Sequence, residues 1–136
     1  MANKLLKSLT IDGQTFDAIA PEWVNPSGQT KSVASGDTVY FNVFTATKKC
    51  NVIGNIQAGF QANATGVRFM WAGREESAST ALVSSRTSAA PTGQTALITP
   101  IEIVLEAGES IFAGVMHTAG TALNVNVDFD GFSFDR

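Results

Sequence analysis

Apolar and polar residues alternate at a period of two along most of the chain, a pattern typical of β-strands rather than helices. The clearest run is TVYFNVFTA, residues 38–46, in which Tyr40 and Phe44 lie on the face opposite Phe41. Both faces of this predicted strand are therefore apolar. Further strands are predicted over residues 51–61, 66–73, 96–106, 110–117 and 122–134.

Turn sequences rich in small and polar residues separate these segments. Asn63-Ala64-Thr65-Gly66 and Ala107-Gly108-Glu109 are examples, and the spacing of such turns is typical of β-sandwiches. A second polar stretch runs from Glu75 to Gln94, and we expect an exposed loop there, with Ala81-Leu82-Val83 pairing as an edge strand. The sequence therefore predicts an all-β fold, an antiparallel two-sheet sandwich over residues 29–136.

The N-terminal segment, residues 1–28, differs from the rest of the chain. Asp12-Gly13 is a strong hairpin signal, because a type I′ turn needs positive φ at both central residues. Two prolines follow, Pro21 and Pro26, and proline cannot occupy a central strand. We therefore predict an N-terminal β-hairpin and Pro-rich arm, in which Leu9 opposes Phe16. An isolated hairpin is marginally stable, so we expect this arm to dock through Leu5, Leu9, Ile11, Phe16 and Trp23.

Size and charge narrow the class of protein. The chain has 136 residues, enough for one domain with a sizeable core, and only 15% of them are charged. Its net charge of −3 offers no electrostatic basis for binding nucleic acid. The N-terminus lacks the apolar region of a signal peptide, and no stretch approaches eighteen apolar residues. We therefore expect a soluble protein made inside the cell, without a membrane partner.

Candidate nucleophiles and bases are few. His117, the single histidine, ends an apolar strand, and the chain has no Gly-x-Ser-x-Gly motif around a serine. Cys50 follows Lys48-Lys49, which could favour its thiolate, but no second reactive group is near it in sequence. We expect both residues to be structural and the protein not to be an enzyme.

The carboxylates do not form a recognisable catalytic or metal site. Asp128-Phe129-Asp130-Gly131 begins like a calcium loop but lacks the closing glutamate. Glu75-Glu76, Glu102, Glu106 and Glu109 are expected on exposed surfaces rather than as a glycosidase pair. There is no nucleotide-binding glycine motif. The sequence predicts no metal and no cofactor.

The last third of the chain resembles a known superfamily. Ile101 to Phe112 reads as a strand, an Ala-Gly-acid turn and a second apolar strand, and the chain closes on Phe132-Ser133-Phe134. This arrangement is similar to the complement-globular-head and tumour-necrosis-factor-like superfamily, and the segment from Gly36 to Gly73 is similar to that family's front half. The resemblance covers residues 30–136. It implies a jelly-roll sandwich and a homotrimer.

The opening Leu9-Thr10-Ile11-Asp12-Gly13-Gln14-Thr15-Phe16 resembles short hairpins of bacteriophage structural proteins, which also use jelly rolls. That resemblance implies a non-enzymatic virion protein, a capsid decoration or head/neck accessory subunit at the virion surface. Its expected partners are copies of itself and the major capsid or neck and tail proteins. The alternative is a receptor-binding head module of a phage fibre that recognises host carbohydrate through the loops at 75–94 or 117–122.

The aromatic residues also bear on the oligomeric state. Outer faces of a sandwich are normally polar, yet several predicted strands are apolar on both faces, as at Phe112 beside Ile111. A closed symmetric assembly is a common cover for such faces. We expect a homotrimer with Tyr40 and Phe44 at the subunit interface.

Overall fold

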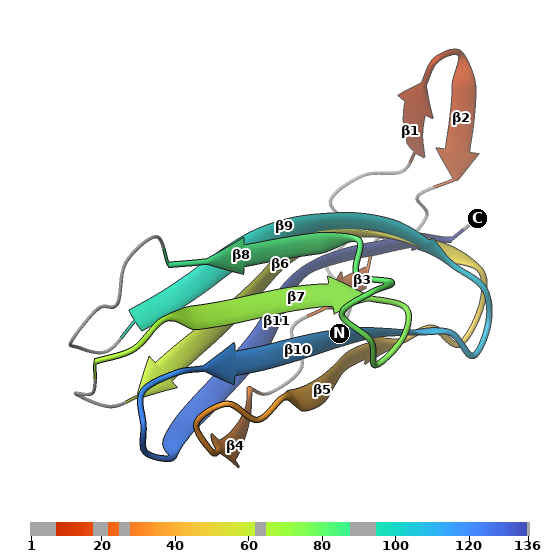
Figure 1. Cartoon of the computed structure of the whole chain (residues 1–136). Coiled ribbons are helices and arrows are strands. Elements are labelled where there is room, and N and C mark those ends of the chain that lie inside the picture. The colour runs from red at the N-terminus through yellow and green to blue at the C-terminus, as the bar shows by residue number, and fades with distance from the viewer. Residues whose placement is uncertain (1–7, 18–21, 25–27, 62–64, 88–94, 136) are drawn as a thin grey trace.

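The computed structural model describes residues 8–17, 22–24, 28–61, 65–87 and 95–135, and the regular secondary structure of these residues is entirely β. Two antiparallel sheets pack face to face (Figure 1). One sheet has the order β5 (Val39–Thr45), β10 (Ser110–His117), β7 (Arg68–Gly73) and β8 (Val83–Arg86). The other has the order β11 (Leu123–Asp135), β6 (Cys50–Gln61) and β9 (Thr95–Leu105), with β3 (Glu22–Val24) and β4 (Gln29–Val33) both pairing with the remaining edge of β11.

The strand order is that of a jelly roll. From β4 to β7 each successive strand lies in the opposite sheet, β8 stays beside β7, and β9, β10 and β11 alternate again. The two four-strand layers, β4-β11-β6-β9 and β5-β10-β7-β8, are the two sheets of an eight-stranded jelly roll. The predicted all-β, two-sheet fold is confirmed, and its six strongest strands lie within two residues of their predicted bounds.

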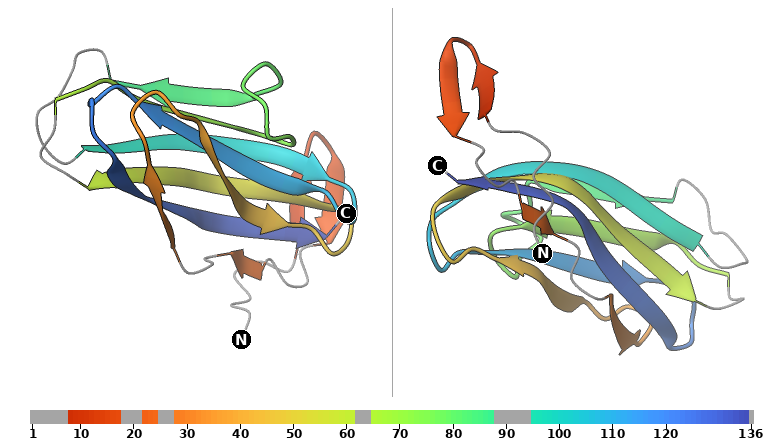
Figure 2. Two further views of the ribbon diagram at one scale, coloured as in Figure 1. Left: turned by 60° about the horizontal axis from the view of Figure 1, so that its bottom comes forward. Right: turned by 180° about the vertical axis from the view of Figure 1, so that it is seen from behind.

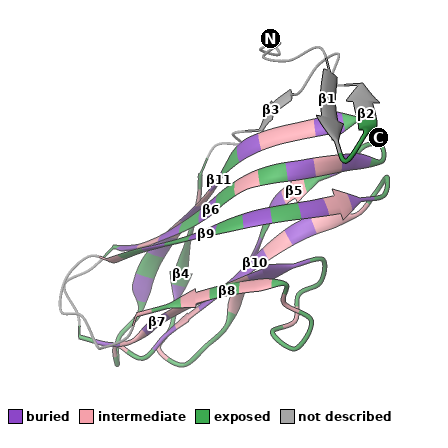
Figure 3. Ribbon diagram, turned by 90° about the horizontal axis from the view of Figure 1, so that it is seen from above, coloured by how far each residue is buried: buried purple, intermediate pink, exposed green. Residues whose placement is uncertain are grey.

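The core lies between the sheets and follows from the alternation of side chains. On β11, every second residue from Leu123 to Phe129 is buried, while Asn124 and Asp130 are exposed. β6 and β9 repeat the pattern, as the striped burial in Figure 3 shows. The largest apolar side chains of the core are Phe41, Phe60, Phe129, Ile56, Met70, Leu105 and Ile111.

A β-bulge corrects the expected orientation of Phe44. The pairing of β10 with β5 shifts between Ile111 and Phe112, whose partners are Phe44 and Asn42, so Val43 is the extra residue. The bulge ends the alternation, and Phe44 packs against the core with its ring 6.3 Å from that of Phe129. The expectation that Phe44 shares an outer face with Tyr40 is therefore wrong.

The N-terminal hairpin has the predicted turn and register. β1 (Ser8–Ile11) pairs with β2 (Gln14–Asp17), and Leu9 lies opposite Phe16. Asp12 and Gly13 have φ angles of 52° and 76°, as a type I′ turn requires. The hairpin projects from the sandwich near the C-terminal end of β11 (Figures 1 and 2), and β2 contacts β11.

Two short strands were not expected. β3 places Trp23 opposite Phe132 in the sandwich sheet, so the Pro-rich stretch is not wholly an arm and sheet pairing begins at Glu22. It lies at the sheet edge, where flanking prolines are tolerated. β4 pairs with the first half of β11, from Val33 opposite Leu123 onward. Its side chains are exposed or half-buried apart from Val33, which explains the absence of an alternating apolar pattern.

The edge strand expected within the polar stretch is present as β8, which begins at Val83, the last residue of the predicted segment. It pairs with β7 alone in its sheet, and the segment between these two strands, residues 74–82, is a loop. Among the described residues, no helix has the length and apolar character needed to cross a lipid bilayer.

Candidate functional site

His117 is enclosed in the core and is bound at both ring nitrogens. Its Nδ1 accepts from the Ala119 N–H at 3.2 Å, so Nε2 carries the proton and donates to the Val33 carbonyl at 2.7 Å. Val33 belongs to β4 and His117 to β10, so the imidazole links the two sheets. This geometry gives His117 a structural role, as the sequence analysis expected.

Arg68 lies beside this histidine and was not foreseen from the sequence. The side chain points inward from β7 and is fully buried, with its guanidinium 6.0 Å from the ring of Phe60 and one nitrogen donating to the Gly66 carbonyl. Burial lowers the pKa of the Arg68 guanidinium because the charged form loses hydration. Phe60 also packs edge-on against His117, with ring centroids 6.4 Å apart. The cluster is therefore part of the core.

The remaining candidate reactive groups are not brought together. Cys50 is buried at the start of β6. Asp128 and Asp130 lie on the outer side of β11, flanking the buried Phe129. Glu106 and Glu109 face lysine and arginine in exposed ion pairs. Within the described ranges, no group of three or more His, Cys, Asp or Glu side chains could hold a metal ion.

The outer side of β5, β10 and β7 carries a patch of large apolar side chains, which we call the aromatic face. Its five members are all half-buried and come from three adjacent strands; they are Tyr40, Phe112, Met116, Phe69 and Trp71. β8 continues this side of the sheet with Ser84 opposite Trp71 and Arg86 opposite Phe69. An apolar patch of this kind on an outer surface is typical of an interaction site.

Trp71 is at the centre of the aromatic face. Tyr40 and Trp71 lie on either side of Gly114, and their rings meet edge to face at 6.1 Å and 78°. The indole packs directly on Gly114, since a Cβ there would be 2.5 Å from its Cε2 and Nε1 atoms. A glycine is thus required beneath this ring. The Nε1 atom is buried and has no acceptor among the described residues.

The outer side of β11, β6 and β9, which we call the polar face, differs from the aromatic face in composition. Its exposed positions are mainly polar or charged and include Asn55, Gln57, Glu102, Asn124 and Asp130. The exceptions are Ala96 and Pro100 on β9 and two isoleucines, Ile53 with 37% of its surface exposed and Ile98 with 58%.

The structure describes side-chain positions for some of the predicted interface and docking residues and not for the others. Tyr40 is on the aromatic face, whereas Phe44 packs on the core. Leu5 lies outside the described residues, and the structure describes only backbone pairing for Leu9, Ile11, Phe16 and Trp23. Neither the subunit interface nor the docking role is tested by these positions, and both stay predictions.

Comparisons with known proteins identify the fold but no sequence family. No protein-family model matches the chain, and no curated protein matches its sequence. A chain of the cryo-EM structure of Broad Bean Stain Virus is similar with a TM-score of 0.59 and 7% identity, over 82% of this chain and 88% of that one. A chain of the Cowpea mosaic virus top component, described as naturally occurring empty particles, has a TM-score of 0.51 and 9% identity, over 79% and 77%. Both neighbours are viral jelly-roll capsid proteins, and at these identities the likeness shows a shared fold.

Proposed function

We propose that this chain is a non-enzymatic structural subunit of a virus particle. More specifically, it is a capsid decoration or head/neck accessory subunit of a tailed bacteriophage, held at the virion surface by its N-terminal arm and assembled as a homotrimer. The observation that carries the proposal is the complete jelly-roll strand order, shared with two viral capsid chains over most of their lengths. Fold alone does not determine function, so the proposal also depends on what the residues do.

The candidate reactive side chains support a structural role. The two nitrogens of His117 are engaged by backbone groups, and Cys50 is enclosed. A general base must reach a substrate proton and a nucleophile must reach a substrate atom, and neither residue is placed to do so.

The hairpin formed by β1 and β2 supports attachment through the arm. It projects from the end of the sandwich, where β2 contacts β11, so it can reach a neighbouring protein without disturbing the core (Figure 2). Backbone pairing within the hairpin satisfies the hydrogen bonds of its two inner edges and leaves its outer edges for a partner strand.

Particle association is the decisive experiment. Particles purified on a density gradient from the cells that produce the chain should contain it, at a copy number divisible by three. Purified full-length chain should also bind particles lacking it, whereas a chain without residues 1–18 should not. A chain that remains entirely in the soluble fraction contradicts the virion role.

Light scattering tests the trimer separately. The purified chain should have about three times its mass of 14.3 kDa. Tyr40→Asp should lower that mass, because a charge would then be buried against apolar groups at the interface. Ile98→Asp on the polar face is the matched control and should leave the mass unchanged. A monomeric wild-type chain contradicts the assembly.

A further inference from the structure

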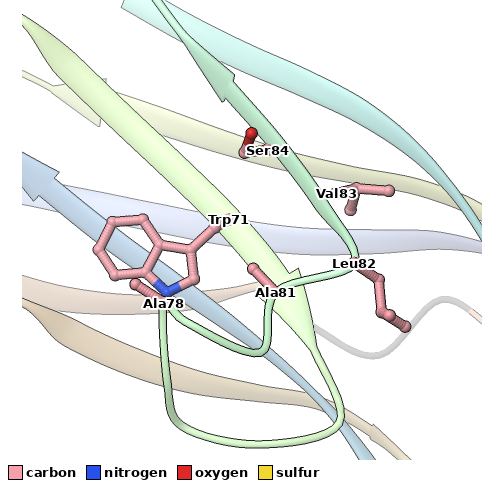
Figure 4. A pocket seen from close by; sticks show the side chains of 6 residues that line it. All are labelled: Trp71, Ala78, Ala81, Leu82, Val83 and Ser84. Carbon is pink, nitrogen blue, oxygen red and sulfur yellow. The ribbon is translucent and has the colours of Figure 1, made fainter.

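The Trp71 indole is a fixed platform on the outer surface of the sandwich. Gly114 lies beneath it without a side chain, and Tyr40 holds its edge. Figure 4 shows the broad face of the ring turned toward the viewer, in front of the strands. A platform held from below and from one side loses little conformational freedom when a ligand stacks on it.

Two hollows adjoin this platform. One, of about 340 Å³, lies between Trp71, β8 and the loop before it, and is lined by Trp71, Ala78, Ala81, Leu82, Val83 and Ser84 (Figure 4). The other, of about 230 Å³, lies on the side of Phe69 and is lined by Phe69, Met70, Trp71, Ser84, Ser85 and Arg86. Trp71 and Ser84 line both hollows, so the two adjoin at these residues.

The lining combines an apolar platform with unused polar groups. Within the described part of the chain, the side chains of Ser84 and Arg86 form no hydrogen bond or ion pair with another residue. They lie opposite Trp71 and Phe69, whereas Ser85 lies opposite the inward Met70 and faces the other side of the sheet. The Ser84 hydroxyl can donate and accept, and the Arg86 guanidinium can donate, on the same side of the sheet as the indole. An aromatic surface with a few convergent polar groups is typical of a site for a small organic ligand.

We propose that Trp71 and its two hollows bind the pyranose rings of a short oligosaccharide. The C–H face of a pyranose is apolar and fits a flat indole, while its hydroxyls match Ser84 and Arg86, which lie on the same side of the sheet as Trp71. The sequence places no aromatic residue in the loop at 75–94, but folding brings Trp71 of β7 beside that loop and supplies the missing stacking surface. The two hollows suit adjacent sugar units.

Other ring-shaped ligands fit the site less well. A nucleobase would also stack on tryptophan, but single-stranded nucleic acid needs a positively charged groove for its phosphates. Arg86 is the one charged residue among those that line the two hollows, and the chain has a net charge of −3. The site therefore favours a neutral or carboxylated sugar.

The site is compatible with the proposed trimer when a neighbouring subunit covers the β5 side of the aromatic face. Tyr40 would then lie at the subunit boundary, and the β7 and β8 side would remain open. The sugar proposal does not depend on the virion role, because it is tested on the purified chain.

Tryptophan fluorescence of a Trp23→Phe chain, in which Trp71 is the one remaining tryptophan, provides the assay. A glycan array is used first to choose longer probes. The chain is then titrated with N-acetylglucosamine, galactose, glucuronic acid, cellobiose and chitobiose. A saturable change in Trp71 emission is expected, with tighter binding of the disaccharide than of its monosaccharide.

Several substitutions are used to locate the sugar site, so that the conclusion does not depend on a single variant. Trp71→Ala should weaken binding on the array about tenfold or more, because it removes the stacking surface. Ser84 and Arg86 lie on an edge strand, so replacing either one should not disturb the fold or the circular dichroism spectrum. Ser84→Ala and Arg86→Ala should each weaken sugar binding severalfold. Ile98→Ala on the polar face should bind as the wild type does.

Two results overturn the proposal. One is the absence of saturable binding to every sugar on the array and in the titrations. The other is binding that survives Trp71→Ala and the two β8 substitutions. If Trp71→Ala instead reduces the mass of the assembly and no sugar binds, the platform is a protein interface and the sugar site is rejected.

Discussion

The polar face and the aromatic face belong to two layers of the same sandwich and have opposite compositions. On β11 and β6 the side chains that point away from the core are mainly polar, such as Asn124 and Asn55. On β10 and β7 the equivalent positions carry Phe112 and Trp71. Both layers bury their inward residues equally well, so core formation does not explain the aromatic face. The difference indicates that one side faces solvent and the other meets a partner or ligand.

Two outward-facing glycines show the same difference between the polar face and the aromatic face. A side chain at Gly59 on the polar face would meet only the Asn126 carbonyl, at 3.9 Å. A side chain at Gly114 on the aromatic face would collide with Trp71. On one face glycine is replaceable, and on the other it makes room for an aromatic ring.

The largest loss of stability is expected when the hydrogen bonds by which His117 links the two layers are removed. His117→Leu leaves the buried Val33 carbonyl and Ala119 N–H without partners. The free energy of unfolding should fall by about 2–4 kcal/mol, since each unsatisfied buried group costs about 1–3 kcal/mol. Urea denaturation measures this, and a loss below about 0.5 kcal/mol would show that the histidine does not join the layers.

The two glycines give a direct comparison of the faces. Gly114→Val should lower the free energy of unfolding by about 1–3 kcal/mol, because the Trp71 ring must move. Gly59→Val should leave it unchanged or raise it by up to about 1 kcal/mol, because valine favours a strand and meets open space. Equal effects at the two sites in urea denaturation would contradict the proposed difference.

Two truncations separate the hairpin from the sandwich sheet. Removal of residues 1–18 should lower the melting temperature only slightly, because the hairpin projects from the end of the sandwich and is not paired with its sheets. Removal of residues 1–27 also deletes β3 and its pairing with β11, and should cost about 1–3 kcal/mol. Calorimetry of both chains measures the difference. A large loss on removing the hairpin alone would place it in the core.

The smallest change in the free energy of unfolding is expected when an exposed ion pair at the end of the sandwich is removed. Lys48 and Asp135 are 2.7 Å apart, and each side chain is more than half exposed. Asp135→Asn should change the free energy of unfolding by less than about 0.5 kcal/mol, because solvent screens such pairs. Denaturation at low and high salt is the measurement, and a strong salt-sensitive loss would show that this pair is a major stabilising contact.

The sequence predicted the layers better than it predicted which side of a strand faces the core. In β7 the aromatic residues Phe69 and Trp71 point outward, while Arg68 and Met70 point inward. Hydrophobicity favours burying aromatics, and only the tertiary environment of Phe60 and Gly66 makes an inward arginine acceptable.

Two other features also depend on contacts that are distant in sequence. The bulge that turns Phe44 toward the core is a mismatch between β5 and β10, which are far apart along the chain. The Trp71 site needs a strand, a loop and Gly114 together. In contrast, Asp12-Gly13 specifies its turn locally, and that prediction is confirmed in both register and φ.

β11 has a consequence for how the protein is made. It is the last of the described strands of the sandwich, and it pairs with β3 and β4 on one edge and with β6 on the other. While a ribosome is still adding residues before Leu123, the earlier strands of this sheet lack the strand that joins them. Residues such as Val52 and Phe60 are then exposed, and pairing of distant segments is slow. The sandwich is therefore expected to fold after β11 leaves the ribosome, which makes chaperone access during translation a determinant of yield.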